Sequence, residues 1–195
     1  MATELLRRLA VTLAAAALLR GAHAADAQPP LTGTSWDLLQ HSAWVAEGAA
    51  STSRVIYVLV DPNCPYCHAL WLKLQTRYAR GVQVRFVMLD IISATSPGKA
   101  AAVLEARDPA RAWRRNETGW NAAAGDVDGG AIKPDPAPPP AIRDKLDKNE
   151  RLMSQLPFAG IPEIFYRDRA GPVHMLAGVP DDARLDAVLD TAGGR

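Results

Sequence analysis

One stretch decides how this chain folds, and it reads Val55-Ile56-Tyr57-Val58-Leu59-Val60-Asp61-Pro62-Asn63-Cys64-Pro65-Tyr66-Cys67. Its first half is a nearly continuous β-branched and apolar run, which predicts a central strand covered on both faces. Asp61-Pro62-Asn63 interrupts this run, and apolar residues at helical spacing follow over residues 68–80. The two cysteines, the only ones in the chain, therefore stand where a strand passes into a helix.

The elements that follow predict an α/β fold. A strand at 82–89 closes a βαβ unit, in which a right-handed crossover makes the two strands parallel. Helices are predicted at 96–106, 108–117 and 141–156, with a surface loop rich in Gly, Pro and Asp at 121–141. Glu163–Arg167 and Val173–Ala177 predict an antiparallel hairpin, and a last helix starts at Pro180. The order is βαβ, a helical insertion over about residues 93–156, then ββα.

Residues 34–48 predict a helix ahead of the main domain. Thr34 and Ser35 can cap it, and Gly48 lies near its end. Trp36, Leu39 and Trp44 fall near one face at helical spacing, which indicates packing. We therefore expect a linker-like helix at 34–48, followed by one domain at 49–195.

The N-terminus has the pattern of an export signal. Arg7-Arg8 precedes a mostly apolar stretch at 9–19, and Ala22-His23-Ala24 supplies small residues where a signal peptidase reads them. We expect residues 1–24 to be removed after Ala24, leaving a short segment at 25–33 and a periplasmic protein. The formal net charge is +1 with no basic run, which gives no reason to expect nucleic acid as a partner.

The Cys64–Cys67 pair is best suited to redox chemistry. As a passive staple it is poor, because closing a four-residue loop contributes only about 2 kcal/mol in the chain-entropy model. At a helix N-terminus, free N–H groups and the macrodipole favour a thiolate at Cys64. Cys64 is then the attacking sulfur, and Cys67 resolves the mixed disulfide. Pro65, Tyr66 and His68 are candidate tuning residues.

Two metal-based alternatives have to be weighed against the redox pair. Cys64-x-x-Cys67-His68 is also the attachment pattern for c-type haem, although no plainly placed second axial ligand appears among Met88, Met153 and Met175. Zinc is disfavoured, since no second Cys or His pair lies at a suitable spacing. We predict no metal and no cofactor beyond a redox-active Cys64–Cys67 disulfide.

The segment from Val60 to Cys67 resembles the active site of the DsbC/DsbG family of periplasmic thiol-disulfide oxidoreductases, and its Pro-Tyr dipeptide is closest to the DsbG branch. The similarity runs from about Thr34 to the C-terminus. It includes Asp108-Pro109-Ala110 with Trp113, Asn149-Glu150 with Leu152-Met153, and Gly178-Val179-Pro180-Asp181.

The resemblance implies a thioredoxin-like fold with a central mixed sheet and a helical insertion. It also implies a cis-proline opposite the cysteines, and Ile161-Pro162 matches it. The backbone of Ile161 would then bind an extended substrate segment. Two features depart from the family: Ile161 stands where Thr is usual, and few residues precede position 34, so we expect no dimerisation domain, no dimer cleft and a monomer.

The function that this implies is disulfide exchange with exported cysteine-containing proteins. A reductase or isomerase would be kept reduced by a membrane partner of the DsbD type, whereas a dithiol oxidase would use a partner of the DsbB type. A haem-binding electron carrier and a peptide-binding chaperone are the alternatives from other classes. A Soret band would identify the carrier, and activity that survives Cys64→Ala would identify the chaperone.

Overall fold

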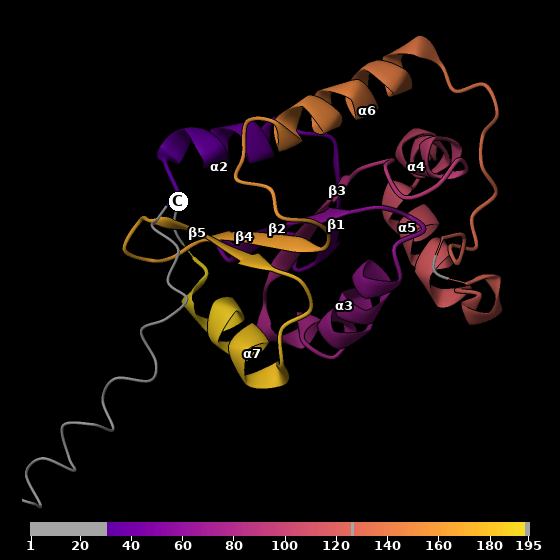
Figure 1. Cartoon of the computed structure of the whole chain (residues 1–195). Coiled ribbons are helices and arrows are strands. Elements are labelled where there is room, and N and C mark those ends of the chain that lie inside the picture. The colour runs from indigo at the N-terminus through magenta and orange to yellow at the C-terminus, as the bar shows by residue number, and fades with distance from the viewer. Residues whose placement is uncertain (1–30, 126, 194–195) are drawn as a thin grey trace, which may run out of the picture.

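The computed structural model describes residues 31–125 and 127–193, which form a five-stranded mixed sheet flanked by helices (Figure 1). The strand order is β1-β3-β2-β4-β5, and only β2 and β3 run parallel. The strands are β1 (Trp44–Gly48), β2 (Val55–Val60), β3 (Gln83–Met88), β4 (Glu163–Arg167) and β5 (Val173–Ala177). The predicted α/β class, the central place of β2 and the antiparallel β4–β5 hairpin are confirmed.

Six α-helices surround the sheet within the described ranges. They are α2 (Gly33–Gln40), α3 (Pro65–Gln75), α4 (Ser96–Glu105), α5 (Pro109–Thr118), α6 (Pro140–Met153) and α7 (Asp182–Thr191). Two short 3-10 turns, η1 (Tyr78–Arg80) and η2 (Ala122–Ala124), complete the set. Helices α2 and α6 lie on one face of the sheet, α3 and α7 lie on the other, and α4 and α5 close one end beside α3 (Figure 1).

The alternation of side chains along β2 builds a separate core on each face, because successive residues of a strand point to opposite sides. Ile56, Val58 and Val60 join the core under α3 and α7, together with Phe86 of β3. Tyr57 and Leu59 face α2 and α6 instead. Both cores are needed to bury β2, which is why its sequence is continuously apolar.

The predicted helix at 34–48 is wrong in its second half. Helix α2 ends at Gln40, and residues 44–48 form strand β1, which pairs antiparallel with β3. Burial alternates along β1, with Val45 and Glu47 inward. The charge of Glu47 hid this alternation in the sequence. One oxygen of its carboxylate, Oε2, accepts hydrogen bonds inside the fold from Tyr78 Oη (2.6 Å) and Trp71 Nε1 (3.1 Å).

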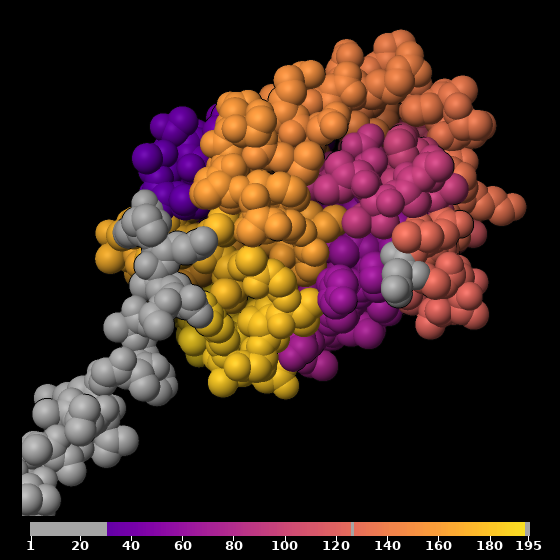
Figure 2. Space-filling model, in the orientation of Figure 1, coloured from indigo at the N-terminus to yellow at the C-terminus, as the bar shows by residue number. Residues whose placement is uncertain are grey.

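The helical insertion is present as predicted and comprises α4, α5, η2 and α6. Figure 2 shows it as a pink-to-orange mass that lies directly against the purple surface of the α3 region. The loop predicted at 121–141 is irregular for most of its length, but it is not all surface, because Gly129 and Gly130 are buried. The insertion therefore reaches under the strand-to-helix junction.

The predicted signal peptide at 1–24 and most of the segment at 25–33 lie outside the described residues. Among the residues that are described, no helix is both long enough and apolar enough to cross a membrane.

Candidate active site

Helix α3 begins directly at the cysteine pair. Cys64 is its N-cap residue, with an extended backbone (φ −81°, ψ 114°), and Pro65 occupies the first turn, where a missing N–H costs nothing. The Cys64 sulfur accepts a hydrogen bond from the backbone N–H of Cys67 (3.2 Å). A sulfur in this position takes the place of the usual capping oxygen, and the first-turn N–H groups stabilise negative charge on it.

Electrostatics separates the two cysteines, whereas exposure does not. Both are free cysteines, and each residue is only 2 % exposed, so exposure does not distinguish them. The pKa of Cys64 is lowered, first by a hydrogen bond from the Cys67 side chain and then by the backbone N–H groups of Cys67 and Tyr66, although burial opposes this. Burial raises the pKa of Cys67 well above its ordinary value, and the nearby Cys64 and Glu117 add to the effect.

A cis peptide bond joins Ile161 to Pro162 at the start of β4, as the family resemblance implied. The carbonyl oxygen of Ile161 lies 3.9 Å from the Cys64 sulfur. The carbonyl oxygen of the next residue, Pro162, accepts a hydrogen bond from the N–H of Gly178 (2.8 Å), which directly follows β5. Cys64 and Ile161, far apart in the sequence, are therefore direct neighbours.

The three candidate tuning residues have different surroundings. Tyr66 is 67 % exposed, so it offers an aromatic surface beside Cys64. Pro65 is half-buried in the first turn of α3. His68 has three close neighbours: its ring stacks on Trp120 (centroids 4.5 Å apart) and Trp71 (6.1 Å), and its Nδ1 lies 2.8 Å from Oε2 of Glu117.

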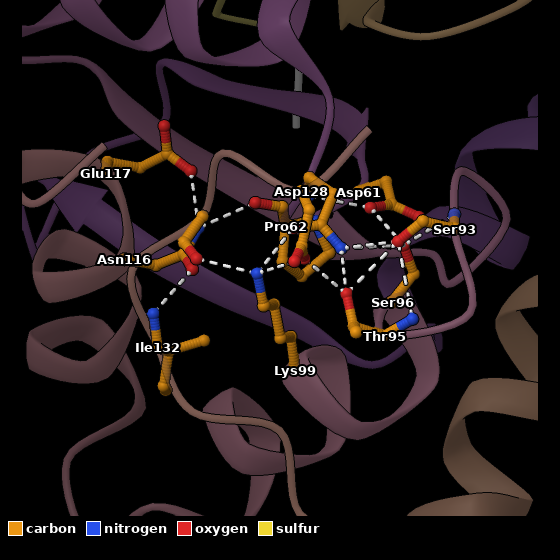
Figure 3. A network of polar contacts seen from close by, with 12 residues as sticks. Asp61, Pro62, Ser93, Thr95, Ser96, Lys99, Asn116, Glu117, Asp128 and Ile132 are labelled. Carbon is orange, nitrogen blue, oxygen red and sulfur yellow. Dashed lines mark hydrogen bonds and ion pairs between the residues drawn. The ribbon is translucent and has the colours of Figure 1, made fainter. Parts of the chain in front are cut away.

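A buried polar network supports the turn between β2 and α3 (Figure 3). Asp61, which is fully buried, accepts hydrogen bonds from the N–H groups of Asn63 (2.8 Å), Ile91 (2.7 Å) and Ile92 (2.9 Å). The hydroxyl of Ser96 donates to the same carboxylate (2.8 Å). Burial nevertheless raises the pKa of Asp61, because these neutral donors only partly replace water. The network ties the residues before the cysteines to the start of α4.

Asn63 and Lys99 form the centre of this network. The side-chain NH₂ of Asn63 donates to the hydroxyls of Ser93 (2.9 Å) and Thr95 (2.9 Å). Its oxygen accepts from Nζ of Lys99 (2.7 Å). Lys99, 4 % exposed, also donates to Oδ1 of Asp128 (2.7 Å) and to the carbonyl of Gly130 (2.7 Å), so all three of its N–H donors are used.

Helix α5 contributes the third part of the network. The side-chain NH₂ of Asn116 donates to the carbonyl of Pro62 (2.9 Å) and to Oε1 of Glu117 (2.9 Å). The oxygen of Asn116 accepts from the N–H of Ile132 (3.2 Å). Asn116 and Glu117 of α5 therefore contact the chain on both sides of the CxxC. Asn116 binds Pro62, which precedes it, and Glu117 binds His68, which follows it.

Sequence reasoning gave these network residues no role at the site. A signal was available in helical spacing: Asn116 and Glu117 follow the buried Trp113 by three and four residues, so they share its inward face. Lys99 likewise lies four residues before the buried Val103 of α4. Polar residues on an inward face need partners, and the polar turn 61–63 offers them.

The structure also bears on the metal alternatives. Across residues 31–125 and 127–193, no three His, Cys, Asp or Glu side chains are grouped so that they could hold a metal ion. His174 contacts Asp168 through Nε2 (2.7 Å) on the β4–β5 hairpin.

Comparison with known proteins agrees with this fold. A family model described as a thioredoxin-like domain matches residues 42–193. The chain is 35 % identical over 161 residues to the thiol:disulfide interchange protein DsbG of Pseudomonas aeruginosa and 31 % identical over 157 residues to that of Escherichia coli. These matches cover 82 % and 79 % of this chain but 60 % of each relative. The chain thus spans well under two thirds of the length of the curated relatives it matches.

Solved structures share the same architecture at low identity. The catalytic domain of Proteus mirabilis ScsC superposes with a TM-score of 0.57 at 19 % identity, over 80 % of this chain and 93 % of that one. The P. mirabilis ScsC structure in a compact conformation gives 0.62 at 18 % identity, over 96 % and 92 % of the two chains. At such identities the superpositions establish the fold alone.

Proposed function

The chain belongs to the family of thioredoxin-like domains, and from that premise we propose that it is a periplasmic thiol-disulfide oxidoreductase in which Cys64 attacks and Cys67 resolves. This proposal rests on the difference between the pKa values of the two thiols. The pKa of Cys64 is lowered and that of Cys67 is raised, although one helical turn separates them. A lowered pKa increases the thiolate fraction of Cys64 and makes its sulfur a better leaving group.

The proposed substrates are exported proteins with exposed cysteines or disulfides. The Ile161 carbonyl beside Cys64 can accept a hydrogen bond from an extended substrate backbone, in a short form of strand addition. Tyr66 adds exposed aromatic surface at the same place. Identity to proteins named thiol:disulfide interchange protein DsbG supports this class of partner.

For the direction of exchange we propose a reductase or isomerase that is served by a membrane partner of the DsbD type. The similarity to DsbG supports this choice. A dithiol oxidase with a DsbB-type partner is the competing role. The redox state of Cys64 and Cys67 in intact periplasm, measured by acid quenching and thiol labelling, separates them: reduced cysteines support the first role, and a disulfide supports the second.

The haem alternative conflicts with the geometry of the motif. Thioether attachment needs both cysteine sulfurs at a haem edge and a free imidazole as axial ligand. Cys67 is buried, and the His68 ring stacks on two tryptophans and is hydrogen-bonded to Glu117. A Soret band in the purified exported protein would nevertheless reverse this assignment.

Trapping with Cys67→Ala in the native periplasm tests the proposal directly. Without the resolving sulfur, mixed disulfides should accumulate at Cys64 and disappear on reduction. Their identities report substrates and redox partner together. The matched control is the double variant Cys64→Ala/Cys67→Ala, which should form none. A folded Cys67→Ala protein that traps nothing beyond this control contradicts the proposal.

A further inference from the structure

The segment at 157–161 leads from α6 to the cis-proline and the cysteines, and a single polar side chain holds it. It has no regular secondary structure (Figure 1). Across the residues that the structure describes, the part of this segment before Ile161 makes one hydrogen bond, from the N–H of Ala159 to Oε2 of Glu163 (3.4 Å). Ile161 itself lies with its carbonyl oxygen 3.9 Å from the Cys64 sulfur. Glu163 therefore anchors the chain that forms this side of the active site.

Glu163 is a carboxyl group in an apolar position of the sheet. It is fully buried in the first position of β4, directly after the cis-proline. Its partner across β2 is Leu59, and Phe165 follows it on the same face; both belong to the core under α2 and α6. One of its oxygens, Oε1, has no hydrogen-bond partner. A buried polar atom left unpaired calls for an explanation, and none of the exchange steps described so far uses this residue.

These surroundings favour the neutral carboxyl group over the carboxylate. A carboxylate would present two charged oxygens to a single N–H donor, whereas the neutral acid needs that donor for one oxygen only. Burial accordingly raises the pKa of Glu163 to about 7, and only the N–H of Ala159 opposes the effect.

Charged neighbours do not cause this preference. The elements packed on that face of the sheet and its ends carry several ionisable residues, and none of them alters the pKa of Glu163. They are Asp37 of α2, Tyr57 of β2 and Asp61 after it, Asp90 after β3, Asp147, Glu150 and Arg151 of α6, Arg167 of β4 and His174 of β5. The protonation state of Glu163 thus follows from its burial and from the position of the segment above it.

Ionisation of Glu163 opposes the closed position of this segment. A buried carboxylate with one donor is strongly destabilised unless water reaches it. The path for water is short, because Ala159 is exposed and no atom lies within 4 Å of the place where a Cβ on Gly160 would stand. A displacement of these two residues hydrates the carboxylate, and it also loosens the backbone of Ile161 beside Cys64.

We propose that the protonated side chain of Glu163 is a positioning residue, which holds the segment at 157–161 in the form that binds an extended substrate, and that ionisation of Glu163 releases this segment. The inference rests on the proposed disulfide exchange and adds a control of the same site by pH. The proton that Glu163 loses goes to solvent, and no bond to sulfur changes. Substrate binding is then strongest in mildly acidic surroundings and weakens as Glu163 ionises, whereas the chemistry at Cys64 does not depend on Glu163.

Two compounds with the same leaving group test this inference. One is Ellman's reagent, and the other is a capped peptide of extended sequence without His, whose one cysteine carries a thionitrobenzoate group. Cys64 displaces thionitrobenzoate from either compound, but only the peptide offers a backbone to Ile161. Stopped-flow absorbance between about pH 5.5 and 8.5 gives the limiting rate and the half-saturating peptide concentration in wild type and in Glu163→Gln. Gln is neutral at every pH and keeps an oxygen for the N–H of Ala159.

We expect wild type and Glu163→Gln to bind the peptide equally at about pH 5.5 and wild type to bind it about tenfold more weakly at about pH 8. One pH unit above a pKa of about 7, only about a tenth of the wild-type molecules keep the proton on Glu163. The difference should lie in the half-saturating concentration and not in the limiting rate. With Ellman's reagent the two proteins should react at equal rates throughout. Glu150→Gln removes an exposed carboxylate of α6 and should follow wild type with both compounds.

A half-saturating concentration with the same pH dependence in both proteins overturns the inference. A difference between them that is equal at every pH does so too, because it would mark a purely structural role. If Glu163→Gln does not fold, carbon-13 NMR titration of Glu163 and amide hydrogen exchange at 159–161 in wild type take its place. A Glu163 pKa below about 5, or exchange protection that its ionisation leaves unchanged, then contradicts the inference.

Failure of the proposed function would look different from failure of this inference. Wild-type protein would then react rapidly with neither compound, and the Cys67→Ala variant would trap no periplasmic partners.

Discussion

The ammonium group of Lys99, in the helical insertion, donates a hydrogen bond to the side-chain oxygen of Asn63, the residue just before Cys64, at 2.7 Å. Both side chains are buried. A buried lysine is stable only when its donors are matched, and here Asn63, Asp128 and Gly130 match all three. The buried ammonium group of Lys99 thus attaches the insertion to the active-site turn. A buried charge of this kind is strongly destabilising when it has no partner.

Replacing Lys99 with Met should therefore destabilise the protein. The buried oxygens of Asn63 and Gly130 and the carboxylate of the exposed Asp128 would lose their donor, and the free energy of unfolding should fall by about 2–4 kcal/mol in urea titrations. Lys148→Met, at an exposed position of α6, is the matched control and should change it by less than about 0.5 kcal/mol. Equal stabilities of the two variants would show that Lys99 does not support the turn.

Gly130→Ala should disturb the same turn from the loop side. A Cβ at this position would lie 2.2 Å from the carbonyl oxygen of Pro62 and 2.5 Å from Oδ1 of Asn116, so the backbone has to shift. We expect a loss of about 1–3 kcal/mol in unfolding free energy and slower alkylation of Cys64. Gly33→Ala, where no atom lies within 4 Å of the new Cβ, is the control and should match wild type.

The pKa of Cys64 should depend on its partner. The Cys67 side chain is the largest cause of the lowered pKa, so Cys67→Ala should raise the Cys64 pKa relative to reduced wild type. Titration of the thiolate absorbance near 240 nm against pH measures the Cys64 pKa in both proteins. In Cys64→Ala, burial should keep Cys67 protonated until strongly alkaline pH. The assignment of roles would be contradicted if Cys67 titrated below Cys64.

Glu163, directly after the cis-proline, should make stability depend on pH. It is fully buried, one of its oxygens has no partner, and burial raises its pKa to about 7. The folded state therefore holds this proton more tightly than the unfolded state, so stability falls as pH rises from about 4.5 to about 7 and levels off above that. Below the unfolded pKa this destabilisation is absent.

Glu163→Gln should remove that pH dependence. At about pH 8 the variant should be the more stable protein, by up to about 3 kcal/mol, and the difference should vanish near pH 4. Guanidinium unfolding at several pH values measures the difference in unfolding free energy at each pH. The exposed Glu150→Gln is the control and should follow wild type throughout. Parallel curves for wild type and Glu163→Gln would contradict a raised pKa at Glu163.

The secondary structure could be predicted from the sequence in segments where a single pattern of apolar residues dominates. The run at 55–60 has no polar residue, and the hairpin strands are short and separated by a turn, so β2, β4 and β5 were located from the sequence. Strand β1 was not, because its inward Glu47 breaks the apolar alternation and only its pairing with β3 makes it a strand. Pairing partners distant in sequence are invisible to local periodicity.

The candidate site divides in a similar way. Cys64, Cys67 and Pro162 follow from local motif and family resemblance. Glu117 and Lys99 act through contacts made across the fold, at separations of 49 and 36 residues from His68 and Asn63. A charged residue inside a helical pattern ordinarily indicates the solvent side, so the helical spacing that puts these two on an inward face is a weak signal, and their partners are visible only in the tertiary structure.

The hydrogen bonds of Lys99 to Asn63 and Asp128 have a consequence for how relatives of this chain diverge. None of the three can change alone without leaving a buried charge or amide unmatched, whereas a simultaneous exchange for smaller or apolar residues preserves the packing. These positions should therefore vary together among homologous sequences, and the insertion should be inherited with the turn that precedes the cysteines rather than gained or lost independently of it.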